Sequence, residues 1–132
     1  NKKLAILGFA FKADTNDTRE SPAIAICKDL LLEGAFLSIY DPKVEKKQIH
    51  SDLFKNGDDN LKVSVASTIQ ESVEHADAII LLTEWEEFKK VNWDKLVPLM
   101  RKPSWLFDTR GIINLQKLKS LGINFWAVGE AN

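Results

Sequence analysis

The chain has 132 residues, of which 45% are hydrophobic and 28% charged, and its formal net charge is -1. This length fits one domain with a buried core. The near-neutral balance lacks the basic excess that nucleic acid or an acidic membrane surface would select, so we expect neither as a partner. Any anion site must therefore be built from a few locally placed cations.

The cysteine content and the first residue of the sequence bear on the cellular compartment and on whether the sequence is a fragment. Cys27 cannot form an internal disulfide, which fits a reducing compartment such as the cytoplasm. No apolar run approaches the ~20 residues that cross a bilayer. The chain begins with Asn1 and its only methionine is Met100, so we expect it to be a fragment of a longer protein.

Short apolar segments alternate with amphipathic ones from one end to the other. Residues 4–7 form an apolar run that ends at Gly8, as expected for a strand covered on both faces. Ser21 and Pro22 open a helix as N-cap and first helical residue, and Gly34 ends it. Further strands are expected at 36–40, 63–65, 78–82, 105–107 and 125–128, further helices at 45–54, 68–75, 93–100 and 115–121, and a turn-rich loop at 56–60.

This alternation predicts a largely parallel sheet with helices on both faces. Right-handed crossovers make it a doubly wound, Rossmann-like α/β fold of three layers, with the 78–82 strand near the centre. No repeat, low-complexity tract or linker divides the sequence. Residues 1–132 are therefore expected to form one domain.

Ligands of such sheets bind beyond the carboxyl ends of the strands, where the strand order reverses. The rule nominates the loops at 9–19, 41–44, 83–88 and 108–113. The stretch that leads into the first of these, GFAFKA at 8–13, holds one glycine and two phenylalanines, so it lacks the G-x-G-x-x-G turn that lets the backbone approach a pyrophosphate. We therefore do not expect this sheet to hold a dinucleotide in the standard way.

Three residues of the 9–19 loop are candidates for ligand contact. The Phe11 ring could pack on a nucleotide base while the Lys12 ammonium meets a phosphate or carbonyl, although Phe11 could instead belong to the core, as we expect for Phe9. Arg19 precedes a helix, where a cation is unfavourable for the helix dipole. That position indicates either a bound anion or a carboxylate partner such as Asp17 or Glu20.

The segment 107–111 provides a second candidate. Arg110, at the end of a strand, can present its planar guanidinium to a phosphate, with Asp108 holding the guanidinium or capping the turn at Gly111. An ordinary surface pair between Arg110 and Asp108 is the alternative.

The other functional residue types predict no catalytic or metal centre. We expect Trp85 and Phe88 to pack against other side chains, and Cys27 falls on an apolar helix face. His50 and His75 lie far apart among polar residues and are expected to be solvated. The sequence offers no nucleophile with an adjacent base and no set of residues at metal-ligand spacing.

Several stretches resemble one family. Residues 8–22, GFAFKADTNDTRESP, are similar to the start of the C-terminal domain in the UDP-glucose/GDP-mannose dehydrogenase family. The segments IYDPKV at 39–44, TEWEEF at 83–88 and FDTR at 107–110 agree in the same order. The resemblance covers essentially the whole chain, and the FAFK and TEW forms are most similar to the branch that acts on UDP-glucose.

The resemblance implies a UDP-binding C-terminal domain of an enzyme that oxidises UDP-glucose to UDP-glucuronate in two NAD-dependent steps. Phe11, Lys12 and Arg110 match positions that contact the UDP-sugar, and Arg19 matches an arginine that reaches toward NAD. An N-terminal domain of the same chain would hold NAD, and the catalytic cysteine, whose motif Cys27 does not match, would lie upstream of this segment. The full-length enzyme is expected to be a homo-oligomer, and this fragment to be inactive alone.

Three other functions compete with this one. The chain could belong to a related branch acting on UDP-N-acetylmannosamine or GDP-mannose. It could be a non-catalytic module that assembles through exposed Trp85 and Phe88. A self-contained NAD-binding domain is disfavoured by the missing glycine motif.

Overall fold

The computed structural model describes residues 2–54 and 61–128. Its strands form one six-stranded sheet, every neighbouring pair parallel, in the order β3-β2-β1-β4-β5-β6. The strands are β1 (Lys3–Leu7), β2 (Phe36–Tyr40), β3 (Val63–Val65), β4 (Ala78–Leu81), β5 (Trp105–Asp108) and β6 (Asn124–Ala127). The prediction of a doubly wound, mainly parallel sheet with a central fourth strand is confirmed.

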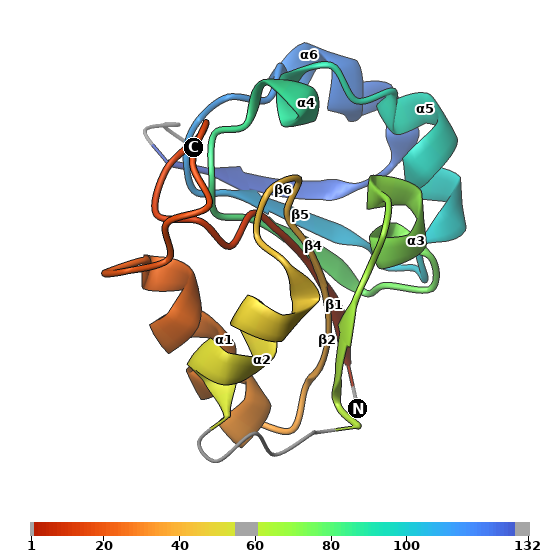
Figure 1. Cartoon of the computed structure of the whole chain (residues 1–132). Coiled ribbons are helices and arrows are strands. Elements are labelled where there is room, and N and C mark those ends of the chain that lie inside the picture. The colour runs from red at the N-terminus through yellow and green to blue at the C-terminus, as the bar shows by residue number, and fades with distance from the viewer. Residues whose placement is uncertain (1, 55–60, 129–132) are drawn as a thin grey trace.

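Helices cover both faces of this sheet. One face carries α1 and α2, and the other carries α3 to α6 (Figure 1). The helices are α1 (Pro22–Leu32), α2 (Lys46–Leu53), α3 (Ile69–Val73), α4 (Glu86–Lys89), α5 (Trp93–Leu96) and α6 (Leu115–Leu118), with 3₁₀ turns η2 (Val97–Leu99) after α5 and η3 (Lys119–Leu121) after α6. The three layers expected from the sequence are present.

Local sequence signals set the ends of α1. The Ser21 side chain accepts the Ala23 amide, and Pro22 occupies the first helical position, where its missing N–H costs nothing. At the other end the Gly34 amide donates to the Leu31 carbonyl, and Gly34 adopts a φ of 89°. Both predicted boundaries are confirmed.

Some elements differ from expectation. The short helix α4 was not predicted, and the last strand begins one residue earlier than expected. The helices predicted at 93–100 and 115–121 each consist of one α-helical turn followed by a 3₁₀ turn. The turn-rich loop predicted at 56–60 lies outside the described residues.

Most of the large apolar side chains are buried in the core. Phe9, Cys27 and Phe88 have no exposed surface, and Trp85 is 5% exposed. Packing of Trp85 and Phe88 is therefore confirmed, and the assembly hypothesis, which required these two side chains to be exposed, is wrong.

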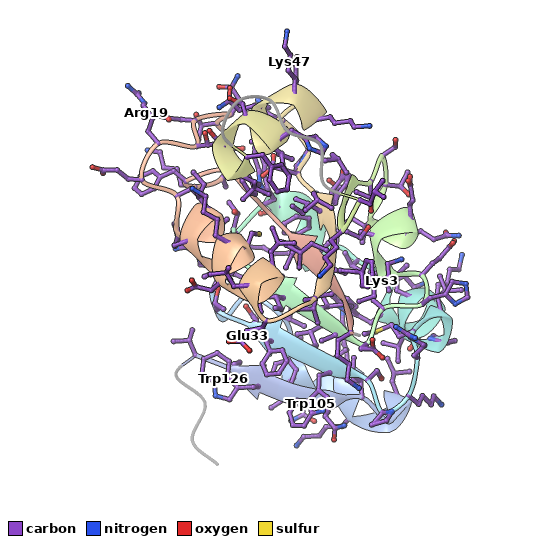
Figure 2. All side chains as sticks on the ribbon, turned by 90° about the horizontal axis from the view of Figure 1, so that it is seen from below. Lys3, Arg19, Glu33, Lys47, Trp105 and Trp126 are labelled. Carbon is purple, nitrogen blue, oxygen red and sulfur yellow. The ribbon has the colours of Figure 1, made fainter. Side chains whose placement is uncertain are left out.

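One face of β5 and β6 keeps aromatic side chains at the surface. Trp105 is 40% exposed and Trp126 is 45% exposed, and Figure 2 shows them on the same side of the sheet. Trp105 stacks on Phe107 with ring centroids 5.5 Å apart. Among the described helices, none is long and apolar enough to span a bilayer.

Candidate functional site

The loops nominated by the sequence meet at the carboxyl edge of the sheet. The strand order reverses between β1 and β4, which are neighbours, and β5 lies next to β4. Phe11 and Lys12 follow β1, Glu84 follows β4, and Arg110 follows β5. These four residues therefore leave three adjacent strands at the position where doubly wound sheets bind ligands.

The loop after β1 holds Phe11 and Lys12 at the surface. The Phe11 amide donates to the Asp17 carbonyl at 2.7 Å, which closes the loop on itself. Phe11 is 42% exposed and Lys12 is also exposed, whereas Phe9 is buried. The core alternative for Phe11 is therefore wrong, and its ring can pack against a ligand.

Arg110 lies across β4 from this loop and is held by two groups that follow that strand. Its Nε donates to the Leu82 carbonyl at 2.9 Å. One terminal nitrogen lies 3.3 Å from Glu84 Oε2, with about a third of each side chain exposed. Because Arg110 is fixed through Nε and one terminal nitrogen, the other terminal nitrogen remains able to donate to a ligand.

Glu84 joins the two halves of the site. Its Oε1 accepts the Ala13 amide at 3.0 Å, while its Oε2 pairs with Arg110. One carboxylate thus connects the residue next to Lys12 with the guanidinium of Arg110. Sequence analysis assigned no role to Glu84, because its contact with Ala13 spans 71 residues and leaves no local pattern.

Asp108 caps the turn that follows β5. Its Oδ1 accepts the Arg110 and Gly111 amides at 3.0 and 2.8 Å, and its Oδ2 accepts the Ile113 amide at 2.8 Å. Of the two roles considered for Asp108, turn capping is the one observed. The guanidinium of Arg110 pairs with Glu84 instead.

Arg19 lies at the outer end of the first loop and pairs with Asp17. Its Nε and terminal nitrogen donate to the two Asp17 oxygens at 3.0 and 2.9 Å, and its side chain is 88% exposed. The hydrogen bond from Arg19 lowers the pKa of Asp17 from 3.8 to about 2. The carboxylate-partner alternative for Arg19 is thus the one seen in the isolated chain.

The first loop does not form a dinucleotide cradle. It runs from Gly8 to Ser21 before α1 begins, so the helix start is far along the chain from the end of β1. The Ala23 amide at that helix start already donates to Ser21 Oγ, and the same hydroxyl donates to the Phe9 carbonyl. The residues of this chain therefore do not fit the standard way of holding NAD.

The remaining histidine, cysteine and carboxylate side chains of the described residues were also considered as a metal or catalytic centre. Within residues 2–54 and 61–128, no group of three His, Cys, Asp or Glu side chains could hold a metal ion. His75 is exposed as expected, but His50 is half-buried beside Phe54, with ring centroids 5.9 Å apart, because α2 turns it inward. Burial raises the pKa of the Cys27 thiol to about 12.

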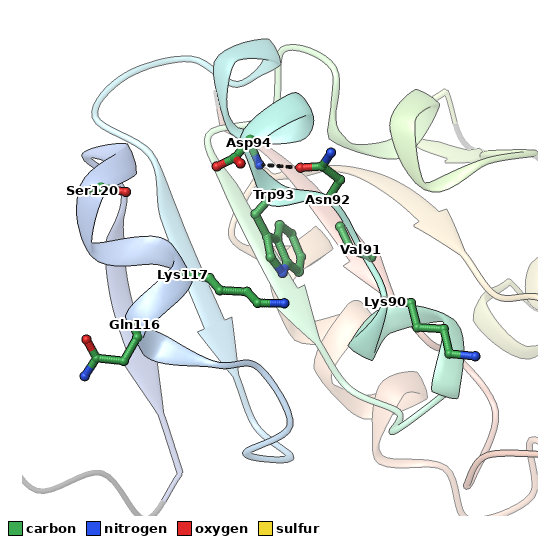
Figure 3. Close-up of a pocket in the computed structure, with 8 residues that line it drawn as sticks. All are labelled: Lys90, Val91, Asn92, Trp93, Asp94, Gln116, Lys117 and Ser120. Atoms are coloured by element: carbon green, nitrogen blue, oxygen red, sulfur yellow. Dashed lines mark hydrogen bonds between the residues drawn. The ribbon is translucent and has the colours of Figure 1, made fainter.

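A cavity of about 470 Å³ lies between α5 and α6 (Figure 3). Lys117 extends from α6 across it toward Trp93, and the Asp94 amide donates to Asn92 Oδ1 at 3.2 Å. Neither Lys12 nor Arg110 lines this cavity. The cavity is therefore separate from the carboxyl edge of the sheet, where the candidate residues predicted from the sequence lie.

Comparison with known families identifies the domain. Residues 5–115 match the model described as the UDP-glucose/GDP-mannose dehydrogenase family, UDP binding domain. The chain belongs to this family. It is 44% identical to UDP-glucose 6-dehydrogenase 2 of Arabidopsis thaliana and 43% identical to UDP-glucose 6-dehydrogenase 1 of Glycine max, over 98% of its length in both cases. It spans only 30% of either plant protein.

Solved structures agree with this family assignment. The chain is 31% identical to the UDP-D-ManNAc dehydrogenase from Pyrococcus horikoshii, with a TM-score of 0.71 over 98% of this chain and 26% of that one. A UDP-glucose dehydrogenase from Pyrobaculum islandicum superposes with a TM-score of 0.71 over 99% of this chain and 26% of that one. Its 20% identity supports the fold alone.

Proposed function

We propose that this chain is the UDP-sugar-binding domain of an NAD-dependent UDP-glucose 6-dehydrogenase, which converts UDP-glucose to UDP-glucuronate. The observation that carries the proposal is the link through Glu84, which ties the loop of Lys12 to Arg110 at the edge where the strand order reverses. The similarity to plant UDP-glucose 6-dehydrogenases supports the choice of sugar nucleotide.

The proposed contacts follow from the chemistry of the exposed groups. The Phe11 ring offers a flat apolar surface to a base or sugar ring, and Lys12 offers a point charge to a phosphate. Arg110 has its charge partly balanced by Glu84, so its remaining N–H groups suit a polar ligand oxygen. These three side chains bind and orient the nucleotide sugar, and none of them acts as a base or nucleophile.

NAD and the catalytic groups belong to another part of the enzyme in this proposal. The bound cofactor would supply hydride acceptance, and Arg19 would contact it after leaving Asp17. The full-length relatives are more than three times as long as this chain, which leaves room for an NAD-binding domain. We place the enzyme in the cytoplasm, consistent with the single free thiol of Cys27, and expect it to act as a homo-oligomer.

Titration of the chain with UDP, followed by NMR, tests the site. UDP should shift the signals of Phe11, Lys12 and Arg110. Replacing Lys12 or Arg110 by Ala should weaken binding by about 1.5–3 kcal/mol, the range for hydrogen bonds to charged groups, or about 10- to 150-fold.

The exposed Lys119 provides the matched control, since it precedes β6 at the opposite edge of the sheet. Lys119→Ala should leave UDP affinity unchanged. Unaltered affinity in both Lys12→Ala and Arg110→Ala would refute the site. UDP-glucose should compete with UDP, whereas stronger competition by GDP-mannose would favour the related branch.

A further inference from the structure

The Asp41 carboxylate lies at the centre of the loops that follow β1, β2 and β4. Its Oδ2 accepts the Phe9 amide at 2.7 Å, the Ala10 amide at 2.9 Å and the Trp85 indole N–H at 3.2 Å. Its Oδ1 accepts the Lys43 and Val44 amides at 2.9 and 3.0 Å. The residue is 9% exposed, so these donors replace water around the charge.

Two of these donors set the course of the chain toward the proposed ligand contacts. After β1 ends, the Gly8 amide donates to the Tyr40 carbonyl, and the next two amides, of Phe9 and Ala10, both donate to Asp41. Phe11 and Lys12 follow directly. Because two successive N–H groups point at one oxygen, the backbone direction entering Phe11 is fixed by the position of that oxygen.

The indole of Trp85 fixes the carboxylate in turn. Trp85 is 5% exposed and follows Glu84, the residue that links Ala13 with Arg110. Asp41 therefore connects the start of the Phe11–Lys12 segment to the same loop that holds Arg110. Bonds to a charged acceptor are stronger than neutral ones, so this arrangement resists displacement of the segment.

We propose that Asp41 is a positioning residue of the nucleotide site, which holds Phe11 and Lys12 in register with Arg110 without itself touching the ligand. This inference rests on the proposed UDP-binding function. It assigns Asp41 a role in binding through the backbone of residues 9 and 10, beyond its role in stabilising the fold.

Asp41→Asn tests the inference, with Asp77→Asn as the matched control. Asparagine has one acceptor oxygen and places an amide N–H₂ where the second oxygen was, so it cannot satisfy all the donors that surround Asp41. Asp77 also accepts a backbone amide, that of Lys3 at 2.9 Å, and pairs with Arg101 at 2.8 Å, but at the amino edge of the sheet.

The expected result is a loss of UDP affinity of about tenfold or more in Asp41→Asn, as for a lost hydrogen bond to a charged group, and a change within about twofold in Asp77→Asn. The ligand-free Asp41→Asn protein should also show faster hydrogen exchange of the Ala10 and Phe9 amides. Equal affinity in Asp41→Asn and the native chain would overturn the inference. So would an equal loss in Asp77→Asn, since that indicates general destabilisation.

Asp41→Glu keeps the inference testable where the Asn variant fails to fold. It retains the charge and both oxygens but moves them by one methylene. We expect folded protein with UDP affinity below that of the native chain and above that of any folded Asn variant, with shifted Phe11 and Lys12 signals. Native affinity with unshifted signals would overturn the proposal. Absence of UDP binding by the native chain would instead refute the proposed function, whatever the exchange rates at Phe9 and Ala10.

Discussion

At the scale of single residues, the ion pair between Arg19 and Asp17 determines how readily the Arg19 side chain can move to contact a ligand. Both side chains lie at the surface, and Arg19 binds the two carboxylate oxygens of Asp17 at once. Exposed pairs of this kind add little to folding stability because water screens them. Arg19 can therefore leave Asp17 at small cost when a stronger acceptor is offered, as the proposed contact with NAD requires.

The pKa of Asp17 reports whether this pair forms in solution. In the native chain the carboxyl group should titrate near 2, because Arg19 stabilises its ionised form. Arg19→Ala should return the pKa toward 3.8. The pair contributes its stabilisation above pH 3.8 and loses it as the pH falls toward 2, which NMR titration of the side-chain carboxyl signal can follow.

Arg101→Ala is the control, since Arg101 pairs with Asp77 at the other edge of the sheet. It should leave the titration of Asp17 unchanged. An Asp17 pKa near 3.8 in the native chain would show that Arg19 is not bound to it, and Arg19 would then be free without any rearrangement.

Sequence reasoning could nominate the residues proposed to contact the ligand more readily than the residues that hold them in place. Phe11, Lys12 and Arg110 follow predicted strands, and their residue types suit a nucleotide. The roles of Asp41 and Glu84 depend on contacts with backbone groups 31 to 71 residues away. No spacing within one sequence reveals such contacts, so Asp41 could be nominated only as part of the 41–44 loop.

At the scale of elements, the approach of β1 to β4 depends on Gly8. Its φ is 99°, a conformation that favours glycine, and it lies at the end of β1 against the loop after β4. A Cβ at this position would lie 2.5 Å from Thr83 Cβ and Oγ1. The Thr83 hydroxyl is itself fixed by donating to the Ala10 carbonyl at 3.0 Å.

Gly8→Ala should therefore lower the free energy of unfolding by about 2–5 kcal/mol, the sum of a left-handed backbone penalty and overpacking. Gly34→Ala has a similar φ of 89° but open space around the added methyl, so it should cost only about 1–2 kcal/mol. Urea denaturation measures both. Equal losses in the two variants would mean that Thr83 moves aside and that the contact between the loops is not tight.

Strands and helices with a strong local sequence pattern were predicted correctly, whereas the short, charged helix α4 was not. The apolar run of β1 and the Ser-Pro start of α1 each carry a signal within a few residues. Helix α4 has only four residues, of which Glu86, Glu87 and Lys89 are charged, so it has no apolar periodicity. Its buried Phe88 anchors it to the core, and that tertiary contact decides its structure.

At the scale of the whole molecule, the sheet is held by contacts between segments distant in sequence. The central pair, β1 and β4, aligns residues 4–7 with residues 78–81. Alternating elements and the right-handed crossover rule were sufficient to predict this topology. They could not predict the exposed Trp105 and Trp126, because the aromatic character of β5 and β6 alone does not show which sheet face lacks a helix.

The thiol of Cys27 provides a probe of global stability. It is fully buried in α1, and burial raises its pKa to about 12, so both access and thiolate are lacking in the folded chain. Alkylation by iodoacetamide at pH 8 should therefore be at least about 10³-fold slower than in the unfolded chain, as expected for a stability of 5 kcal/mol or more. The rate should rise steeply with urea, because the thiol reacts only after the core opens.

Leu32→Cys in a Cys27→Ala background supplies the comparison, since Leu32 lies in the same helix and is 86% exposed. That thiol should react at once and with little dependence on urea. A similarly weak urea dependence at Cys27 would show that α1 detaches while the sheet stays folded. The loop carrying Phe11 and Lys12 joins β1 to α1, so such detachment would leave that loop tied at only one end and weaken the proposed binding site.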